Sequence, residues 1–183
     1  MVVSKEYDNP MHTKALEILC NLTRFPSNNA VMAKYPGLVD SLVFNGRSKL
    51  GDDRIWALRS LQNLSSDVAG KTILANNVVL ELLSVSVMRK QYDEQRAATA
   101  TLYNLSTEPG AVVPLTNTKN VVATLVHVAH SPESPSDIRI TACDALATLG
   151  LWLQTLAGAG TVPNDVQQVP LPSYATYGWE RWD

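Results

Sequence analysis

The stretch Trp56-Ala57-Leu58-Arg59-Ser60-Leu61-Gln62-Asn63-Leu64-Ser65 recurs in outline three more times along the 183-residue chain. If Asn63 is taken as the reference position, the equivalent residues are Asn21, Asn104 and Thr148, so successive copies lie 42, 41 and 44 residues apart. A regular period of this length is typical of repeat proteins, in which each unit buries its apolar face against its neighbours. The sequence therefore predicts a stack of similar helical units.

Three positions in each copy have the same residue type throughout. The sixth residue before the reference position is always Ala, and the second before it and the first after it are always Leu. At about 100° per residue these positions fall within roughly 60° of one another, so they form one stripe of a helix. We expect this stripe to be the core. Its members are Ala15, Leu19 and Leu22; Ala57, Leu61 and Leu64; Ala98, Leu102 and Leu105; Ala142, Leu146 and Leu149.

A second set of positions lies on a different face of the same helices. It consists of the reference position and the residues four and seven before it, and we call it the ladder, because stacking would align it along the molecule. Its members are Lys14, Glu17 and Asn21; Trp56, Arg59 and Asn63; Ala97, Ala100 and Asn104; Thr141, Asp144 and Thr148.

Breaks between the apolar segments divide each complete copy into a short, a medium and a long helix. The first copy has only its last helix, expected at 10–24. Turn and loop segments then separate the other helices, at 36–37, 46–51, 76–77, 90–93, 116–118 and 131–136. The expected ranges are 28–35, 38–45 and a long helix capped by Asp52; 68–75, 78–89 and 94–106; 110–115, 120–130 and a last long helix that ends near Gly158. Residues 1–160 are expected to form one all-α domain, followed by a tail at 161–183.

The composition narrows the class of protein. The net charge of −2 comes from mixed acidic and basic residues, which argues against a nucleic-acid partner. The first ten residues lack a secretory signal, and no apolar run reaches the length of a membrane span. We therefore expect a cytoplasmic or nuclear protein with no membrane partner. Cys20 and Cys143 lie in the first and last copies, roughly 30 Å apart if helix layers are about 10 Å thick, so we expect two buried thiols and no disulfide.

The pattern resembles the armadillo repeat. The resemblance rests on the endings Ala-x-x-x-Leu-x-Asn-Leu-Ser/Thr at 15–23, 57–65 and 98–106, and on the helix breaks before Leu38, Val78 and Val121. It covers about residues 10–156. The resemblance implies a right-handed α-solenoid of about three and a half to four three-helix units, whose long helices line a concave groove.

In armadillo proteins the ladder asparagines bind the backbone of an extended peptide, since an amide offers both donors and an acceptor. The resemblance therefore places a partner on the ladder, with Trp56 and Arg59 as anchors, because aromatic and Arg side chains usually dominate such contacts. Importin-alpha proteins carry Trp four residues before the Asn to form lysine slots, and this chain does not. The predicted partner-binding residues are Glu17, Asn21, Trp56, Arg59, Asn63, Ala100 and Asn104.

An alternative role for these residues is structural. Asn near a helix end also satisfies polar groups of a neighbouring unit, and Trp56 could pack in the core. Thr148 departs from Asn, so we expect the groove to weaken toward the C-terminus.

We expect a non-enzymatic scaffold that binds a protein or peptide and needs no cofactor. An alternative is an assembly module that self-associates through the ends of the stack and the tail. A third hypothesis is an enzyme with a metal at His127 and His130, although two imidazoles alone are too few ligands. The tail is richer in aromatic residues than a disordered segment. We expect it to cover the last unit, lie along the groove or contact another protein through Tyr174, Tyr177, Trp179 and Trp182.

Overall fold

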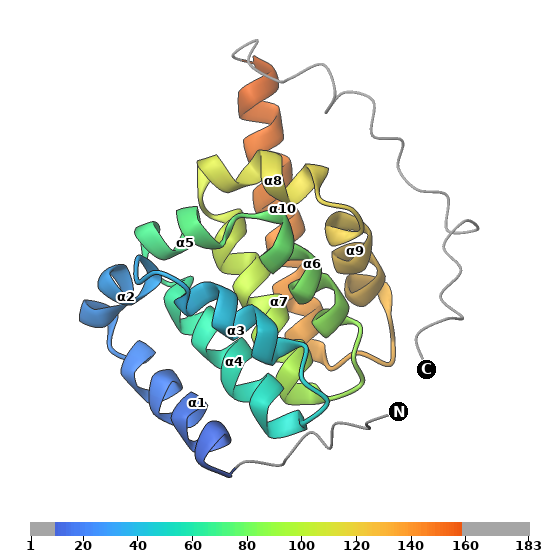
Figure 1. Cartoon of the computed structure of the whole chain (residues 1–183). Coiled ribbons are helices and arrows are strands. Elements are labelled where there is room, and N and C mark those ends of the chain that lie inside the picture. Colours follow the sequence, from blue (N-terminus) through green and yellow to red (C-terminus); the bar gives the residue numbers. More distant parts are fainter. Residues whose placement is uncertain (1–9, 159–183) are drawn as a thin grey trace, which may run out of the picture.

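The computed structural model describes residues 10–158, and within them every regular element is helical (Figure 1). This part of the chain is therefore all-α. A lone long helix, α1 (Pro10–Thr23), precedes three groups that each follow the expected order of short, medium and long helix. The groups are α2 (Pro26–Ala33), α3 (Leu38–Gly46) and α4 (Gly51–Leu64); α5 (Val68–Leu74), α6 (Asn77–Val87) and α7 (Tyr92–Ser106); and a 3-10 turn η1 (Pro109–Ala111) with α8 (Val112–Asn117), α9 (Val121–His130) and α10 (Ser136–Gly158).

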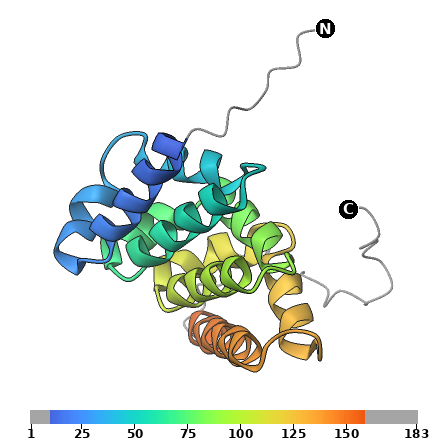
Figure 2. The ribbon, with the colours of Figure 1, turned by 90° about the horizontal axis from the view of Figure 1, so that it is seen from below.

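The long helices lie side by side in chain order. Helix α1 packs on α4, α4 packs on α7, and α7 packs on α10. Figure 2 shows α1 and α10 at opposite ends of this row. The shorter helices are arranged in the same way, since α2 contacts α5, and α3 and α9 both contact α6. Each helix thus meets the equivalent helix of the next group.

The predicted core stripe is buried in α4 and α7, and almost entirely in α10. The prediction is wrong at the first copy, where Ala15 and Leu22 are exposed. The side of α1 that carries them faces away from α4, and no described helix covers it. Helix α1 instead buries Leu16, Cys20 and Thr23, which are on its opposite side.

Local backbone signals set most helix ends. Asp67 caps α5 by accepting a hydrogen bond from the Ala69 amide at 2.8 Å, and Asn76 caps α6 in the same way. Gly37, before α3, has a left-handed φ of 78° that suits a residue without a side chain. The predicted cap at Asp52 is wrong, because α4 already begins at Gly51 and its N-cap is Leu50, two residues earlier. The Asp52 carboxylate lies instead in the first turn, where the helix dipole favours it.

A buried ion pair joins α4 to α7. The Arg54 guanidinium donates from Nε to both carboxylate oxygens of Glu94, at 3.0 and 3.1 Å, and both side chains are more than nine-tenths buried. Arg54 Nη1 also donates to the carbonyls of Ser48 and Lys49. The guanidinium therefore donates hydrogen bonds to backbone carbonyls of the loop that precedes α4 as well as to the carboxylate. Its planar set of donors makes this arrangement possible, and Lys could not replace it.

A close backbone contact fixes the turn between α4 and α5. A Cβ atom placed on Gly70 would lie 1.9 Å from the carbonyl oxygen of Leu64, which is far inside van der Waals contact. Only glycine lets the start of α5 approach the end of α4 so closely.

We predict that Gly70→Ala destabilises the protein by about 1–3 kcal/mol or more, because the backbone of Leu64 cannot move away without disturbing α4. The measurement is urea unfolding followed by circular dichroism. Gly150→Ala is the matched control, since a Cβ atom added there would have no atom within 4 Å, and it is inside α10, where Ala stabilises a helix by about 1 kcal/mol. Equal effects of the two substitutions would contradict the close contact.

We predict that Glu94→Ala costs about 3–5 kcal/mol of unfolding free energy, because it leaves the Arg54 charge buried without its carboxylate. Asp93→Ala removes the adjacent, exposed carboxylate, whose pair with Arg59 lies at the surface, and should cost no more than about 1 kcal/mol. The comparison uses the same urea titration. A loss for Asp93→Ala as large as that for Glu94→Ala would show that burial does not decide the effect.

Candidate functional site

The ladder residues lie on one side of the long helices, and most of them are half-buried. Lys14, Asn21 and Asp144 are exposed, whereas Ala97 is buried under its neighbours. The remaining ladder residues are intermediate: Glu17; Trp56, Arg59 and Asn63; Ala100 and Asn104; Thr141 and Thr148. The ladder is therefore a mainly polar surface whose side chains are mostly only partly accessible to a ligand.

Trp56 and Arg59 form the centre of this surface. The Arg59 guanidinium carbon lies 5.4 Å from the centroid of the Trp56 ring, within the range of a cation–π interaction. Arg59 Nη2 also pairs with Asp93 Oδ1 of α7 at 3.1 Å. The Trp56 ring packs partly against the core and leaves the rest of its surface exposed. On α1 a separate pair, Lys14 with Glu17 at 2.8 Å, neutralises the neighbouring part of the ladder.

The ladder asparagines bind the preceding long helix. Asn63 Nδ2 donates to the Thr23 hydroxyl at 3.1 Å and to the Cys20 carbonyl at 3.3 Å, and Asn104 Nδ2 donates to the Ser65 hydroxyl at 2.9 Å. The structural alternative for these side chains is therefore present at both positions. Within residues 10–158 neither Oδ1 atom accepts a hydrogen bond, so each amide keeps an acceptor for another group.

These bonds also explain the Ser/Thr that ends each copy of the motif, which the sequence reasoning missed. The hydroxyls of Thr23 and Ser65 are buried and donate to the carbonyl three residues earlier in their own helix. Each oxygen then accepts a hydrogen bond from the asparagine of the next unit. Because the reference Asn and the Ser/Thr two residues later recur together, the motif itself contains the signal for this contact between units.

The series stops at both ends of the row. In α10, Thr148 replaces Asn and its hydroxyl donates to the Asp144 carbonyl of its own helix at 2.8 Å. Asn21 is exposed on α1, where the described residues supply no preceding helix. In the described part of the chain, the reference-position asparagines that join units are therefore Asn63 and Asn104.

A second set of polar contacts lies near the N-terminal ends of the long helices. Thr13 donates to Asp53 at 2.6 Å across α1 and α4, as Arg54 does to Glu94 across α4 and α7. At the next junction the Tyr92 hydroxyl donates to Asp137 at 2.7 Å, and this hydrogen bond raises the pKa of the Tyr92 hydroxyl. Each of these contacts joins two successive long helices, and the three pairs lie at three different junctions.

The two cysteines differ in environment. Both are free, as expected, but the prediction that both are buried is wrong, because Cys143 is exposed on the outer side of α10. That side has no described long helix beyond it, whereas the equivalent side of α1 packs on α4. Burial raises the pKa of the Cys20 thiol, which disfavours the reactive thiolate.

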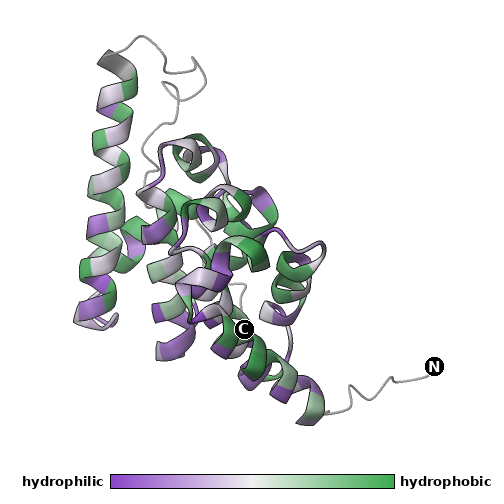
Figure 3. Cartoon of the chain, turned by 90° about the vertical axis from the view of Figure 1, so that its left-hand side faces the viewer, coloured by the Kyte–Doolittle hydropathy of each residue, from purple (hydrophilic) through white to green (hydrophobic). Residues whose placement is uncertain are grey.

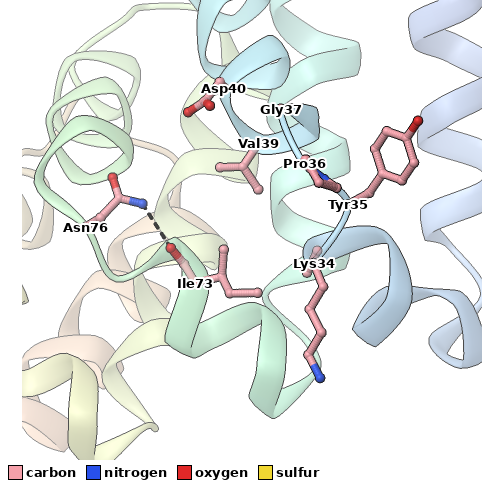
Figure 4. A pocket seen from close by; sticks show the side chains of 9 residues that line it. Lys34, Tyr35, Pro36, Gly37, Val39, Asp40, Ile73 and Asn76 are labelled. Carbon is pink, nitrogen blue, oxygen red and sulfur yellow. Dashed lines mark hydrogen bonds between the residues drawn. The ribbon is translucent and has the colours of Figure 1, made fainter.

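A shallow pocket of about 440 Å³ lies away from the ladder, between the turn that joins α2 to α3 and the turn that joins α5 to α6. Figure 4 shows Val39, Ile73 and Asn76 around it, while the side chains of Lys34 and Tyr35 extend away. The Asn76 amide donates to the Ile73 carbonyl. Since no set of polar groups converges in this pocket, it does not suggest a small-molecule site.

The metal site hypothesised at His127 and His130 was compared with the positions of the described side chains. His130 Nδ1 lies 2.9 Å from the Val126 carbonyl of its own helix. Among the described residues, no group of three or more His, Cys, Asp and Glu side chains is placed to hold a metal ion.

No single helix in that part of the chain is long and apolar enough to cross a membrane, although α5 and α6, which meet at 90°, satisfy the length and composition as a pair. The tail residues Tyr174, Tyr177, Trp179 and Trp182 lie outside the described residues.

Comparisons with known proteins identify a fold but no family. Neither a family profile nor a curated protein matches the chain. Among solved structures, the crystal structure of an engineered protein from the Northeast Structural Genomics Consortium is similar, with a TM-score of 0.70 and 20% identity over 86% of this chain. The chain spans 65% of that protein's length. At this identity the similarity concerns the all-helical fold alone.

We predict that a thiol reagent at pH 8 and low protein concentration modifies Cys143 rapidly and Cys20 only after unfolding. Cys143 is exposed, whereas Cys20 is buried and its pKa is raised by that burial, so little Cys20 thiolate forms. Mass spectrometry of peptides after timed maleimide labelling measures the two rates separately. Labelling in urea controls for the intrinsic reactivity, and equal native rates would contradict the burial of Cys20.

Proposed function

We propose that the chain is a right-handed, armadillo-like α-solenoid of three and a half to four units that acts as a non-enzymatic protein-binding scaffold. The ladder is the proposed binding surface, and an extended segment of a partner protein is the proposed ligand. In this proposal the scaffold binds its partner in the cytoplasm or nucleus and needs no cofactor. Support for the architecture comes from the 41- to 44-residue period and from the stepwise packing of equivalent helices.

The single observation that carries the binding proposal is the Trp56–Arg59 pair on the ladder. The ring and the guanidinium stack at 5.4 Å, and Asp93 holds the guanidinium from the next long helix. Such a pre-organised aromatic and cationic surface loses little conformational entropy when a ligand covers it. Trp and Arg are also the residue types most enriched among residues that dominate binding energy.

The hydrogen bonds of Asn63 and Asn104 refine how a peptide would be held. Their Nδ2 atoms are engaged with the preceding unit, so the free Oδ1 atoms are the groups left for a ligand. A peptide backbone would therefore donate its N–H groups to these oxygens. Because Asn63 and Asn104 belong to adjacent long helices, the proposed contact covers α4 and α7 and excludes α10, where Thr148 bonds its own helix.

The experiment that tests this function is selection of binders from a phage-displayed library of random 12-residue peptides on the full-length chain. The strongest peptide is then synthesised, and its affinity is measured by fluorescence anisotropy. Arg59→Ala should weaken its binding at least about fivefold, the loss expected for a residue that contributes more than about 1 kcal/mol. Tyr35→Ala, beside the shallow pocket, is the matched control and should leave the affinity unchanged.

Substitution of the ladder asparagines needs a stability control. Asn104→Ala removes the bond to Ser65 as well as the proposed ligand acceptor, so it should also lower the unfolding free energy by about 1 kcal/mol. Binding measured well below the unfolding temperature separates the two effects. A selected peptide that binds equally to wild type, Arg59→Ala and Asn104→Ala, or a selection that yields no specific peptide, would count against the ladder as the site.

A further inference from the structure

The loop that joins α9 to α10 contains the same dipeptide twice. Ser131-Pro132 and Ser134-Pro135 are the two places in the 183-residue sequence where Pro follows Ser or Thr. The residues from 131 to 135 lie outside any helix, and Pro132 and Glu133 are exposed. Figure 3 shows α10 along one edge of the molecule, and its first turn, which follows this loop, is mostly hydrophilic. The two serines therefore lie in a short loop at the surface.

The hydroxyl of Ser134 has no hydrogen-bond partner in the described part of the chain. Its backbone N–H donates to the Ser131 carbonyl at 3.2 Å and closes a turn. Hydroxyls on the long helices, such as those of Ser60 and Thr101, instead donate to a carbonyl of their own helix. The half-buried Ser134 side chain is therefore held by no other polar group, and opening of the turn exposes its oxygen.

A nearby cation also lacks a partner. Within the described residues, the half-buried Arg139 side chain has no hydrogen bond or ion pair. Arg139 is the fourth residue of α10, as Arg54 is the fourth residue of α4. The backbone N–H of each bonds the carbonyl four residues earlier, which belongs to Leu50 at 3.2 Å for Arg54 and to Pro135 at 3.0 Å for Arg139. The two side chains therefore begin at equivalent positions of their helices.

Arg54 shows how far a side chain at this position extends. Because side chains of a helix tilt toward its N-terminus, the guanidinium points back to the preceding loop. Its Nη1 donates to the carbonyl oxygens six and five residues before it, at 3.0 and 2.9 Å. Counted in the same way, the residue five before Arg139 is Ser134. Arg54 also has the Glu94 carboxylate of the next long helix, whereas no described helix follows α10 to supply one to Arg139.

We propose that Ser134 is the phosphorylation site of a proline-directed protein kinase and that Arg139 binds the phosphate. In the transfer, Ser134 Oγ attacks the γ-phosphorus of ATP. An O–P bond forms as the bond to the β-phosphate oxygen breaks, so that ADP leaves, and a base of the kinase takes the hydroxyl proton. The bound phosphate carries close to two negative charges, and a guanidinium can donate to two of its oxygens at once.

Two acidic residues close to Ser134 in sequence make Arg139 necessary for this contact. Glu133 and Asp137 would both repel a phosphate. The Asp137 carboxylate accepts a hydrogen bond from the Tyr92 hydroxyl of α7 at 2.7 Å, and residues two apart on a helix do not face each other, so Asp137 leaves Arg139 unpaired. The phosphate should therefore stabilise the start of α10 when Arg139 is present and lose that effect when the guanidinium is removed.

Ser131 provides a comparison within the same loop. It is the C-cap residue of α9, and its N–H donates to the His127 carbonyl at 2.9 Å. Negative charge at the C-terminal end of a helix is unfavourable, because the helix dipole is negative there. Ser131 is also eight residues before Arg139, farther back than the five and six residues that Arg54 spans. A phosphate on Ser131 should therefore not stabilise the protein.

The test is treatment of the full-length chain with a purified mitogen-activated protein kinase and ATP, followed by mass spectrometry and thermal unfolding. Ser131→Ala leaves Ser134 as the one Ser-Pro step, and Ser134→Ala is the matched control. We expect phosphorylation to raise the melting temperature of Ser131→Ala by about 2–4 °C. It should not raise that of Ser134→Ala, nor that of Ser131→Ala combined with Arg139→Gln. Each phosphorylated variant is compared with its own unphosphorylated form, so effects of the substitutions themselves cancel.

A synthetic peptide of residues 128–140 controls for recognition of the sequence by the kinase. If the peptide is phosphorylated and the full-length chain is not, the folded loop is closed to the kinase and the proposal is overturned. Failure of both to react, or modification of the wild type at Ser131 alone, also overturns it. An equal rise in melting temperature with Arg139→Gln would exclude Arg139 as the residue that binds the phosphate. None of these outcomes depends on peptide binding at Arg59.

Discussion

The close approach of the long helices is the constraint on which the rest of the structure depends. Two helices can pack closely side by side only if one of them presents small side chains to the other. Ala57, Ala98 and Ala142 are these small, buried residues, at the same position of successive units. Ser60 and Thr101 are small as well, and their buried hydroxyls return to carbonyls of their own helix, so they add no unsatisfied group. A larger residue at one of these buried positions would force the two helices of that junction apart.

Polar contacts at both ends of the long helices fix their relative positions. At one end Asn63 and Asn104 reach the hydroxyl of the preceding unit, and near the other end Arg54 meets Glu94. A buried ion pair contributes little net stability, because desolvation of both charges offsets their attraction. The pair instead fixes the alignment of α4 with α7, because a slip of one helical turn would leave both charges buried and unpaired. Apolar packing therefore holds the helices together, and the polar groups select one alignment.

The sequence predicted the helical order and the core stripe well, because both follow from periodicity within a unit. Its errors concern what lies outside a unit. Ala15 and Leu22 match the core pattern but are exposed, because no described helix covers α1, and Cys143 is exposed for the same reason at α10. The ladder asparagines were recognised, but the same Asn pattern fits a peptide contact and a contact between units, and only the position of the Ser65 hydroxyl distinguishes them. The Arg54–Glu94 pair was missed, since charges in sequence give no sign of their burial.

The junctions also change in chemistry along the row. Between α4 and α7 a buried ion pair and an amide–hydroxyl bond accompany the apolar contact, whereas in α10 Ile138 takes the position of Glu94 and Thr148 the position of Asn104. Apolar association weakens as temperature falls, because its driving force near room temperature is mainly the entropy of water. The junction between α7 and α10 relies on that force more than its neighbours do. On cooling, the contact between α7 and α10 should therefore weaken more than the contact between α4 and α7.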